Sequence, residues 1–224
     1  MKIALVGGTG DMGEGLALRW CIAHDIFIGS RRREKGERRA REYLEKAEEF
    51  YGERMNGTIS GGSNEDVVKE VEVVVLTIPY EHAESTLEVI GRSLGGKIVI
   101  SPVVPMKLDK GAFVYDPHLE DGEVTSHAEL IAGKIPDAVV VSAFHAISAK
   151  KLADPSLVLD YDVPLATDDE EGRRVVEKLI EEIPKLRPVY VGPLCVSSLL
   201  EALTPLLLNA SKFCGLKNPS IKFL

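Results

Sequence analysis

The residues whose chemistry is easiest to interpret form a glycine-rich loop, GGTGDMG, at positions 7–13 of this 224-residue sequence. The loop follows the short apolar run Ile3–Val6 and opens a helical pattern. Glycine at this spacing allows a tight turn, a close backbone approach to a pyrophosphate, and close packing of a helix against a strand. The first N–H groups of a helix also attract anions. The loop therefore predicts a dinucleotide site, with contacts from Gly8, Thr9, Gly10, Asp11, Met12 and Gly13.

Asp11 fits this site less well than its neighbours, because a carboxylate repels a pyrophosphate placed beside it. Two arrangements avoid the repulsion. The side chain can point away from the ligand, or it can accept hydrogen bonds from N–H groups in the first helical turn. The sequence leaves both open, and the whole loop has a bland alternative, a glycine turn that only packs.

The end of the second predicted strand indicates which dinucleotide is bound. NAD sites usually carry Asp or Glu there to hold the ribose hydroxyls. Here the strand ends at Gly29, and Ser30, Arg31 and Lys35 follow. A hydroxyl and two cations suit a 2′-phosphate, so these residues predict a preference for NADP. The alternative is a solvated helix face whose arginines pair with nearby glutamates, which we expect for most of Arg38–Arg41.

Apolar runs of strand length alternate with helical patterns over much of the chain. The runs are apolar on both faces, which is typical of parallel strands covered by helices on each side. The alternation predicts an α/β fold with a Rossmann-type, doubly wound, mainly parallel sheet. The predicted strands are Lys2–Val6, Asp25–Gly29, Thr58–Ser60, Val73–Ile78, Lys97–Ser101 and Ala138–Ser142, and the predicted helices are Leu16–Ile22, Arg33–Met55, Glu65–Val71 and Glu81–Leu94.

The pattern changes in the C-terminal third. Strands predicted at Val163–Thr167 and Pro188–Val191 flank a helix at Asp169–Ile183, and a last helix covers Val196–Phe213. We expect residues 1–192 to form the NADP-binding domain with added C-terminal strands, and residues 193–224 a small helical segment. Polar residues and a proline interrupt the last apolar run, so it is interpreted as a core or interface helix and not a membrane span. The apolar character of this last helix favours a homodimer.

Composition excludes several other classes of protein. The net charge of -8 argues against nucleic-acid binding, because a phosphate backbone needs a basic surface. The three cysteines, Cys21, Cys195 and Cys214, lack the short spacing of a zinc site, and we expect them to be buried, reduced and unpaired. The N-terminal apolar run, Ile3–Val6, is far too short for a signal peptide, so a cytoplasmic location is predicted.

Residues for acid–base or nucleophilic catalysis are not evident. No tyrosine is followed by lysine four positions later, the histidines show no metal-binding spacing, and there is no Gly-x-Ser-x-Gly motif. A hydride passing between two organic cofactors needs little from the protein beyond binding and alignment. The absence therefore fits an oxidoreductase of that kind, with no metal.

Several segments beyond the loop resemble one family, the NADPH-dependent coenzyme F420 reductases of archaeal type. They are Gly7–Gly10 with Gly15–Arg19, Gly29–Arg32, Leu76–Ala83, Lys97–Pro102, Val141–His145, Leu186–Pro188, Gly192–Leu194, Leu203–Leu206 and Ile221–Leu224. The resemblance covers nearly the whole chain. It departs at Asp11-Met12, where the family commonly has Asn-Leu, and at Ala146 and Ser148, where it often has Thr and Pro.

The resemblance implies direct hydride transfer between NADP(H) and coenzyme F420, a deazaflavin. It implies that Thr77, Ile78 and Pro79 line the cofactor cleft, that His145 and Ile147 face the deazaflavin, and that the last helix completes an apolar pocket. Ser101 either binds the ligand or only satisfies its loop. Two other functions stay open from the residues: an NADP-dependent imine or carbonyl reductase similar to pyrroline-carboxylate reductase, and a non-enzymatic NADP-sensing module.

Overall fold

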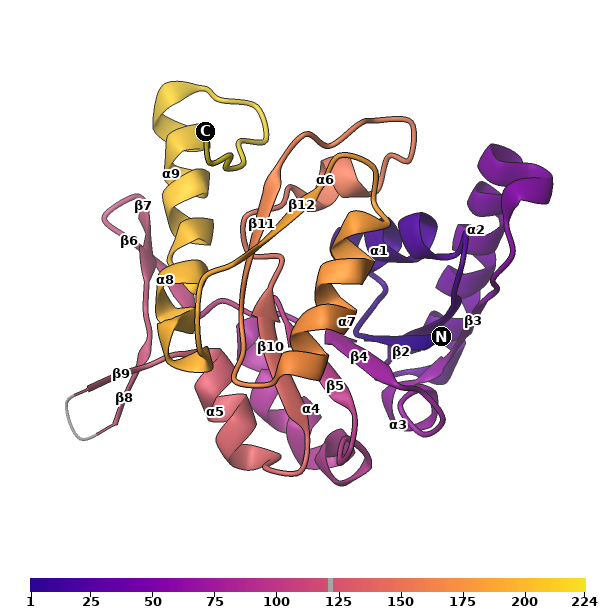
Figure 1. The fold of residues 1–224 in the computed structure, drawn as a ribbon, viewed down its shortest axis with the longest axis horizontal. Helices are drawn as coiled ribbons and strands as arrows, with labels where there is room; N and C mark the ends of the chain where they lie inside the picture. The colour runs from indigo at the N-terminus through magenta and orange to yellow at the C-terminus, as the bar shows by residue number, and fades with distance from the viewer. Residues whose placement is uncertain (121–122) are drawn as a thin grey trace.

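The computed structural model describes residues 1–120 and 123–224, and its centre is a single eight-stranded sheet (Figure 1). The strand order is β12-β11-β10-β5-β4-β1-β2-β3, and every neighbouring pair is parallel except β10 with β11. The strands are β1 (Lys2–Val6), β2 (Asp25–Ser30), β3 (Ile59–Ser63), β4 (Val73–Leu76), β5 (Ile98–Ser101), β10 (Val139–Ala143), β11 (Asp162–Ala166) and β12 (Arg187–Tyr190). This arrangement confirms the predicted fold class.

Helices cover both faces of the sheet, and each face has its own core. Along β1, Ile3 and Leu5 point into one core, while Ala4 and Val6 point into the other. The first core is closed by α1 (Asp11–Trp20), α2 (Arg33–Tyr51), α6 (Ala149–Leu152) and α7 (Glu170–Glu181), and the second by α3 (Asn64–Val67), α4 (Ala83–Ile90) and α5 (His127–Lys134). Because both faces are buried, the central strands β1, β4 and β5 are apolar at nearly every position.

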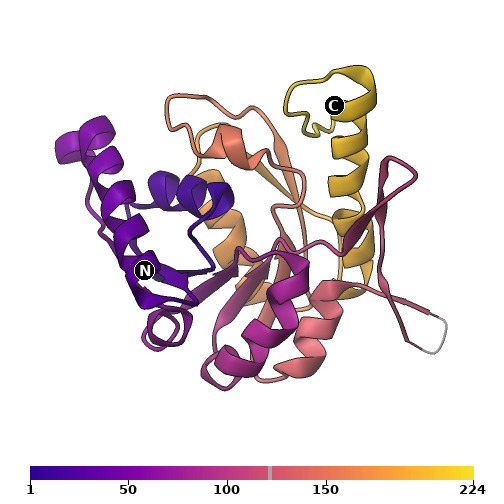
Figure 2. The ribbon, with the colours of Figure 1, turned by 180° about the vertical axis from the view of Figure 1, so that it is seen from behind.

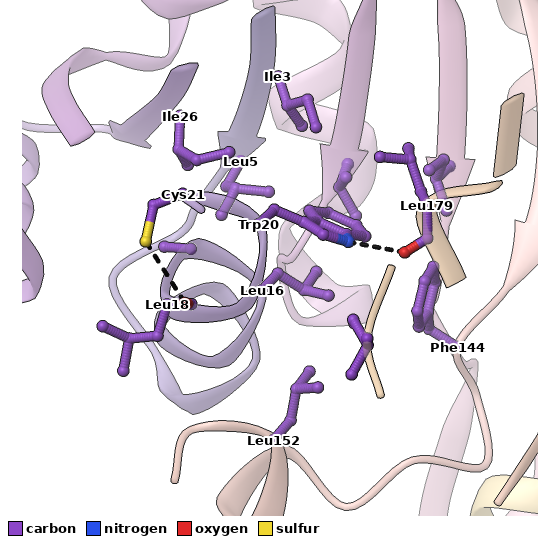
Figure 3. Close-up of a cluster of buried hydrophobic side chains, with 14 of the residues drawn as sticks. Ile3, Leu5, Leu16, Leu18, Trp20, Cys21, Ile26, Phe144, Leu152 and Leu179 are labelled. Atoms are coloured by element: carbon purple, nitrogen blue, oxygen red, sulfur yellow. Dashed lines mark hydrogen bonds between the residues drawn. The ribbon is translucent and has the colours of Figure 1, made fainter. Parts of the chain in front are cut away.

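Trp20 fixes α1 against the far half of the sheet, as Figure 3 shows. Its indole Nε1 donates a 2.8 Å hydrogen bond to the Leu179 carbonyl of α7. Its ring meets Phe144 edge to face at 5.8 Å between centroids. A buried indole needs a partner for its N–H, so this bond sets how α1 and α7 pack. The glycine loop, which starts α1, is thereby held in a fixed position.

The C-terminal elements extend beyond the sheet (Figures 1 and 2). A hairpin of β6 (Met106–Asp109) and β7 (Ala112–Tyr115) lies alongside the last helices, α8 (Ser197–Glu201) and α9 (Leu203–Cys214). The Asn209 amide bonds both the N–H and the carbonyl of Phe113, at 2.8 and 2.7 Å. This two-way bond ties α9 to the hairpin edge. The strands β8 (His118–Glu120) and β9 (Glu123–Thr125) also pair, antiparallel.

The helical run Leu194–Cys214 is 21 residues long, and its length and composition alone would suffice to cross a membrane. One side of it packs on the β6–β7 hairpin and on α5. The other side exposes large apolar residues, among them Leu199, Leu206 and Phe213.

Several local predictions were wrong in detail. The expected helix Glu81–Leu94 is divided into the 3₁₀ turn η2 (Tyr80–His82), α4 and the 3₁₀ turn η3 (Gly91–Ser93). The expected helix Arg33–Met55 ends at Tyr51 and continues only as the 3₁₀ turn η1 (Gly52–Arg54); a further 3₁₀ turn, η4 (Leu194–Val196), precedes α8. Of the cysteines, Cys21 is buried as expected, but Cys195 and Cys214 are exposed.

Candidate functional site

A cleft of about 590 Å³ opens at the carboxyl ends of the central strands. It lies at the point where the strand order turns back, with β1 leading on one side to β2 and on the other to β4. Ligands of open α/β sheets bind at such a switch point. The cleft is lined by Gly7, Thr9, Gly10, Asp11, Met12, Gly13, Ser30, Arg31, Lys35, Asn64, Leu76, Thr77, Ile78, Pro79, His82, Thr86, Pro102 and Ala149.

The loop glycines have different roles. Gly7 has φ +70°, and a Cβ there would lie 2.3 Å from Cγ2 of Ile78. A Cβ on Gly13 would lie 2.4 Å from the Gly8 Cα, so these two positions need glycine for packing. A Cβ on Gly10, by contrast, would meet nothing within 4 Å. The backbone at Gly10 is therefore open to a ligand, as a pyrophosphate site requires, whereas Gly8 forms the turn behind the lining.

Three side chains hold the loop from outside, and sequence reasoning missed these roles. Oδ1 of Asn64 accepts from the Gly7 N–H at 3.1 Å, and Oγ1 of Thr77 donates to the Val6 carbonyl at 2.9 Å. Nε of Arg39 donates to the Thr9 carbonyl at 3.2 Å. Nothing in the local sequence distinguishes Arg39 from its basic neighbours, because the contact depends on how α2 packs beside the loop.

The structure separates the two alternatives for Asp11. It is the first residue of α1 and is exposed, and its carboxylate accepts no hydrogen bond within residues 1–120 and 123–224. The cap of the first-turn N–H groups by Asp11 is therefore not formed. Those N–H groups stay available to an anion, and solvent screens the carboxylate.

The basic residues near the tip of β2 fall into two groups. Arg31 and Lys35 line the cleft with Ser30, and neither has an ion pair within the described parts of the chain. Arg33, by contrast, pairs with Asp66 at 2.6 Å, and Arg38 pairs with Glu42 at 3.3 Å. The solvated, paired helix face thus accounts for Arg33 and Arg38. It does not account for Arg31 and Lys35, whose charges face the cleft unneutralised.

A second, mostly apolar cavity of about 370 Å³ adjoins this cleft. The two share Ile78, Pro79 and Pro102. Thr204 of α9 and Met106 of the β6–β7 hairpin contribute the far side. The last helix therefore reaches the end of the cleft opposite the cationic residues.

The remaining predicted residues lie behind these cavities. Ser101 and Ile147 are buried and line neither cavity. His145 is 7% exposed, follows Phe144 with φ 71°, and its ring nitrogens have no hydrogen-bond partner in the described residues. Burial lowers the pKa of His145 to about 3, so its imidazole is neutral at physiological pH. Eleven of the fifteen predicted residues line the cleft, and Gly8, Ser101, His145 and Ile147 do not.

The doubly wound sheet, the glycine turn and the cleft at the switch point define a Rossmann-type nucleotide-binding protein. The family model described as "NADP oxidoreductase coenzyme F420-dependent" matches residues 2–105. The chain is 40% identical to the F420-dependent NADP reductase of Methanocaldococcus jannaschii, covering 93% of this chain and 92% of that protein. It is 35% identical to the F420-dependent NADP reductase of Methanothermobacter marburgensis, covering 99% and 97%.

Among solved structures, a putative F420-dependent NADP reductase from Arthrobacter sp. FB24 superposes with a TM-score of 0.82 at 22% identity, covering 100% of this chain and 99% of that one. That likeness concerns the fold. The identities to the two archaeal proteins extend over nearly full length. The chain therefore belongs to the F420-dependent NADP reductase family, and the resemblance found in the sequence is confirmed.

Proposed function

We propose that this protein transfers a hydride between NADP(H) and coenzyme F420. The observation that carries the proposal is the continuity of the two cavities. A cleft with unpaired cations at one end runs into an apolar cavity at the other, and both are bounded by Ile78, Pro79 and Pro102. A dinucleotide has its phosphates at one end and its reactive ring at the other, so this arrangement suits a second flat ring beside the first.

The phosphate end depends on two sets of groups. The backbone around Gly10 and the free N–H groups of the first turn of α1 would bind the pyrophosphate. Ser30, Arg31 and Lys35 would bind the 2′-phosphate and so select NADP over NAD. Because Asp11 is exposed and fills no cap, it does not block this arrangement.

The apolar end needs no proton donor. The reaction moves a hydride from one ring to the other, and the protein has to hold the two rings together and exclude water. His145 is neutral and buried, which suits a contact role and not general acid catalysis. Its ring does not line the cavity, so its contact with the deazaflavin, like that of Ile147, requires the loop after β10 to adjust on binding.

The proposal gives residues 193–224 two roles. Thr204 of this segment lines the apolar cavity, so the segment completes the second-substrate pocket. Leu199, Leu206 and Phe213 follow one another at intervals of seven residues and are 69%, 61% and 65% exposed. A stripe of this kind is costly in water, and we assign it to the contact between two copies in a homodimer. A cytoplasmic location remains a prediction.

The test is optical. Protein mixed with NADPH and oxidised coenzyme F420 should bleach the deazaflavin absorbance, and NADH at equal concentration should react far more slowly. No bleaching across a broad pH range would remove the proposal. The absence of bleaching is what we would expect of an imine or carbonyl reductase or of an NADP-sensing module, but the relatives that match over nearly full length favour neither.

A further inference from the structure

We propose that Arg39 is a positioning residue that orients the Thr9–Gly10 peptide for pyrophosphate binding. The inference rests on the proposed use of NADP. It assigns a role to a side chain that the sequence places on a solvated helix face. It also links the glycine loop to α2, the helix whose first turn carries Lys35.

The guanidinium of Arg39 is held on three sides. Nε donates to the Thr9 carbonyl at 3.2 Å, Nη1 bonds Glu42 at 2.6 Å, and Nη2 lies 3.8 Å from a carboxylate oxygen of Glu14 on α1. The group also stacks over the Tyr43 ring, 5.2 Å from its centroid. The side chain is 28% exposed, less than half the 62% of Arg38. A planar guanidinium spreads five N–H donors over several sides, whereas the compact ammonium of a lysine has three donors on one atom.

The bond to Thr9 determines the direction of the next N–H group. In a trans peptide the carbonyl and the following N–H point to opposite sides, and the described chain contains no cis peptide bond. With the Thr9 carbonyl turned toward α2, the Gly10 N–H is turned the other way, toward the cleft that Thr9 and Gly10 line. The Gly10 N–H has no backbone acceptor in residues 1–120 and 123–224, so it is available to a phosphate oxygen.

The same contact sets the spacing of the two phosphate sites. Arg39 lies one helical turn after Lys35 on α2, and α2 approaches the sheet closely because Gly36 packs on the Gly62 carbonyl. The glycine loop is thus tied to the helix that carries part of the 2′-phosphate site. Loss of the tie would weaken binding of the whole dinucleotide. It would leave a ligand that carries only a 2′-phosphate unaffected.

The experiment compares two ligands across three proteins: wild type, Arg39→Met and the matched control Arg38→Met. Arg38 is on the same helix and pairs with the same Glu42, but no bond from it to the glycine loop occurs in the described chain. Titration calorimetry gives Kd for NADP⁺ and for 2′-AMP. We expect Arg39→Met to raise the Kd for NADP⁺ about 10-fold, as the loss of a charge-assisted hydrogen bond predicts, and the Kd for 2′-AMP less than about twofold. Arg38→Met should change neither.

Each other result overturns the inference. An unchanged Kd for NADP⁺ in Arg39→Met would mean that Arg39 forms only a surface ion pair. An equal increase in the Kd for 2′-AMP would mean that Arg39 contacts the 2′-phosphate directly. Arg39→Lys keeps the charge but can bond only part of the acceptor set, so its Kd for NADP⁺ should lie between those of wild type and Arg39→Met. It replaces Arg39→Met if that variant does not fold. If wild type itself fails to bind NADP⁺, the proposed function is wrong, which is a separate outcome.

Discussion

The hydroxyl of Thr204 on α9 donates a 2.8 Å hydrogen bond to the carbonyl of His145. This contact spans 59 residues of sequence and joins the last long helix to the loop after β10. The loop contains Phe144 in the left-handed region, which is unfavourable for a bulky residue, so the surrounding bonds must hold it there. Oγ of Ser220 donates a second hydrogen bond to this loop, 2.6 Å long, to the Ala146 carbonyl.

Replacing Thr204 by Val should weaken the binding of coenzyme F420 more than the binding of NADPH. Val keeps the shape of Thr but removes the donor, so the His145 carbonyl loses its bond and the loop beside the apolar cavity loosens. We expect the KM for coenzyme F420 to rise several-fold while the KM for NADPH stays unchanged, and the free energy of unfolding to fall by about 1 kcal/mol. Steady-state kinetics and urea denaturation measure these. Thr204→Ser, which retains the hydroxyl, should behave like wild type, and equal effects of Val and Ser would contradict the role of the bond.

Reversing the charge of Arg31 should abolish the preference for NADP. Its guanidinium faces the cleft with no ion pair in the described chain, so Arg31→Glu both removes an attraction and adds a repulsion to the 2′-phosphate. We expect the ratio of kcat/KM for NADPH over NADH to fall by about two orders of magnitude. Arg33→Glu is the control, because Arg33 already pairs with Asp66 and does not line the cleft. An unchanged ratio in Arg31→Glu would show that another group reads the 2′-phosphate.

The sequence predicted the parallel half of this fold well, for a physical reason. Its central strands are buried on both faces, so Val73–Leu76 and Ile98–Ser101 form short, nearly continuous apolar runs. The β6–β7 hairpin escaped prediction because its first strand, Met106–Asp109, is only four residues long and exposed throughout, so it has no buried apolar run. The reversed direction of β11 is set by tertiary packing, which a run of apolar residues does not encode.

The candidate site was predictable from the sequence where its features depend on local residue types, such as glycine spacing. The glycine spacing and the absence of an acid near Ser30 predicted two groups of residues that the structure brings together in one cleft. Side chains that act at a distance were not predictable: Asn64 and Arg39 bond the loop from elements 57 and 30 residues away. Position at the strand end, by contrast, was enough to separate Arg31, which lines the cleft, from Arg33, which pairs with Asp66.

The buried carboxyl of Glu201 should make stability depend on pH. It accepts bonds from the Tyr115 hydroxyl at 2.7 Å and from the N–H groups of His127 and Ala128, both at 3.1 Å. Burial outweighs these bonds and raises the pKa of Glu201 from 4.5 to about 7, and Glu129 adds a like charge nearby. Between these pH values the folded state holds more protons than the unfolded state, so the free energy of unfolding falls as pH rises from 4.5 to 7.

Glu201→Gln should remove this dependence. The difference in free energy of unfolding, variant minus wild type, should therefore increase across the window from 4.5 to 7 and be constant above it. Denaturant titrations at a series of pH values measure it. Tyr115→Phe gives an independent check: the Tyr115 hydroxyl lowers the folded-state pKa of Glu201, so its loss should move the upper end of the window to higher pH. A variant-minus-wild-type difference that does not vary with pH would mean that Glu201 titrates as in water.

The stripe of Leu199, Leu206 and Phe213 should decide the oligomeric state. Burying such side chains gains about 1.5–3 kcal/mol each, whereas a carboxylate buried in their place is costly. Leu206 is the middle residue of the stripe and is 61% exposed in the single chain, so Leu206→Glu should convert a dimer into a folded monomer. Val158, which is 67% exposed but lies in the loop after α6, supplies the control Val158→Glu, which should leave the mass unchanged. Light scattering after size-exclusion chromatography distinguishes the two. A wild-type protein that is monomeric at micromolar concentration, or a Leu206→Glu variant that stays dimeric, would require another explanation for an apolar stripe that the single chain leaves in water.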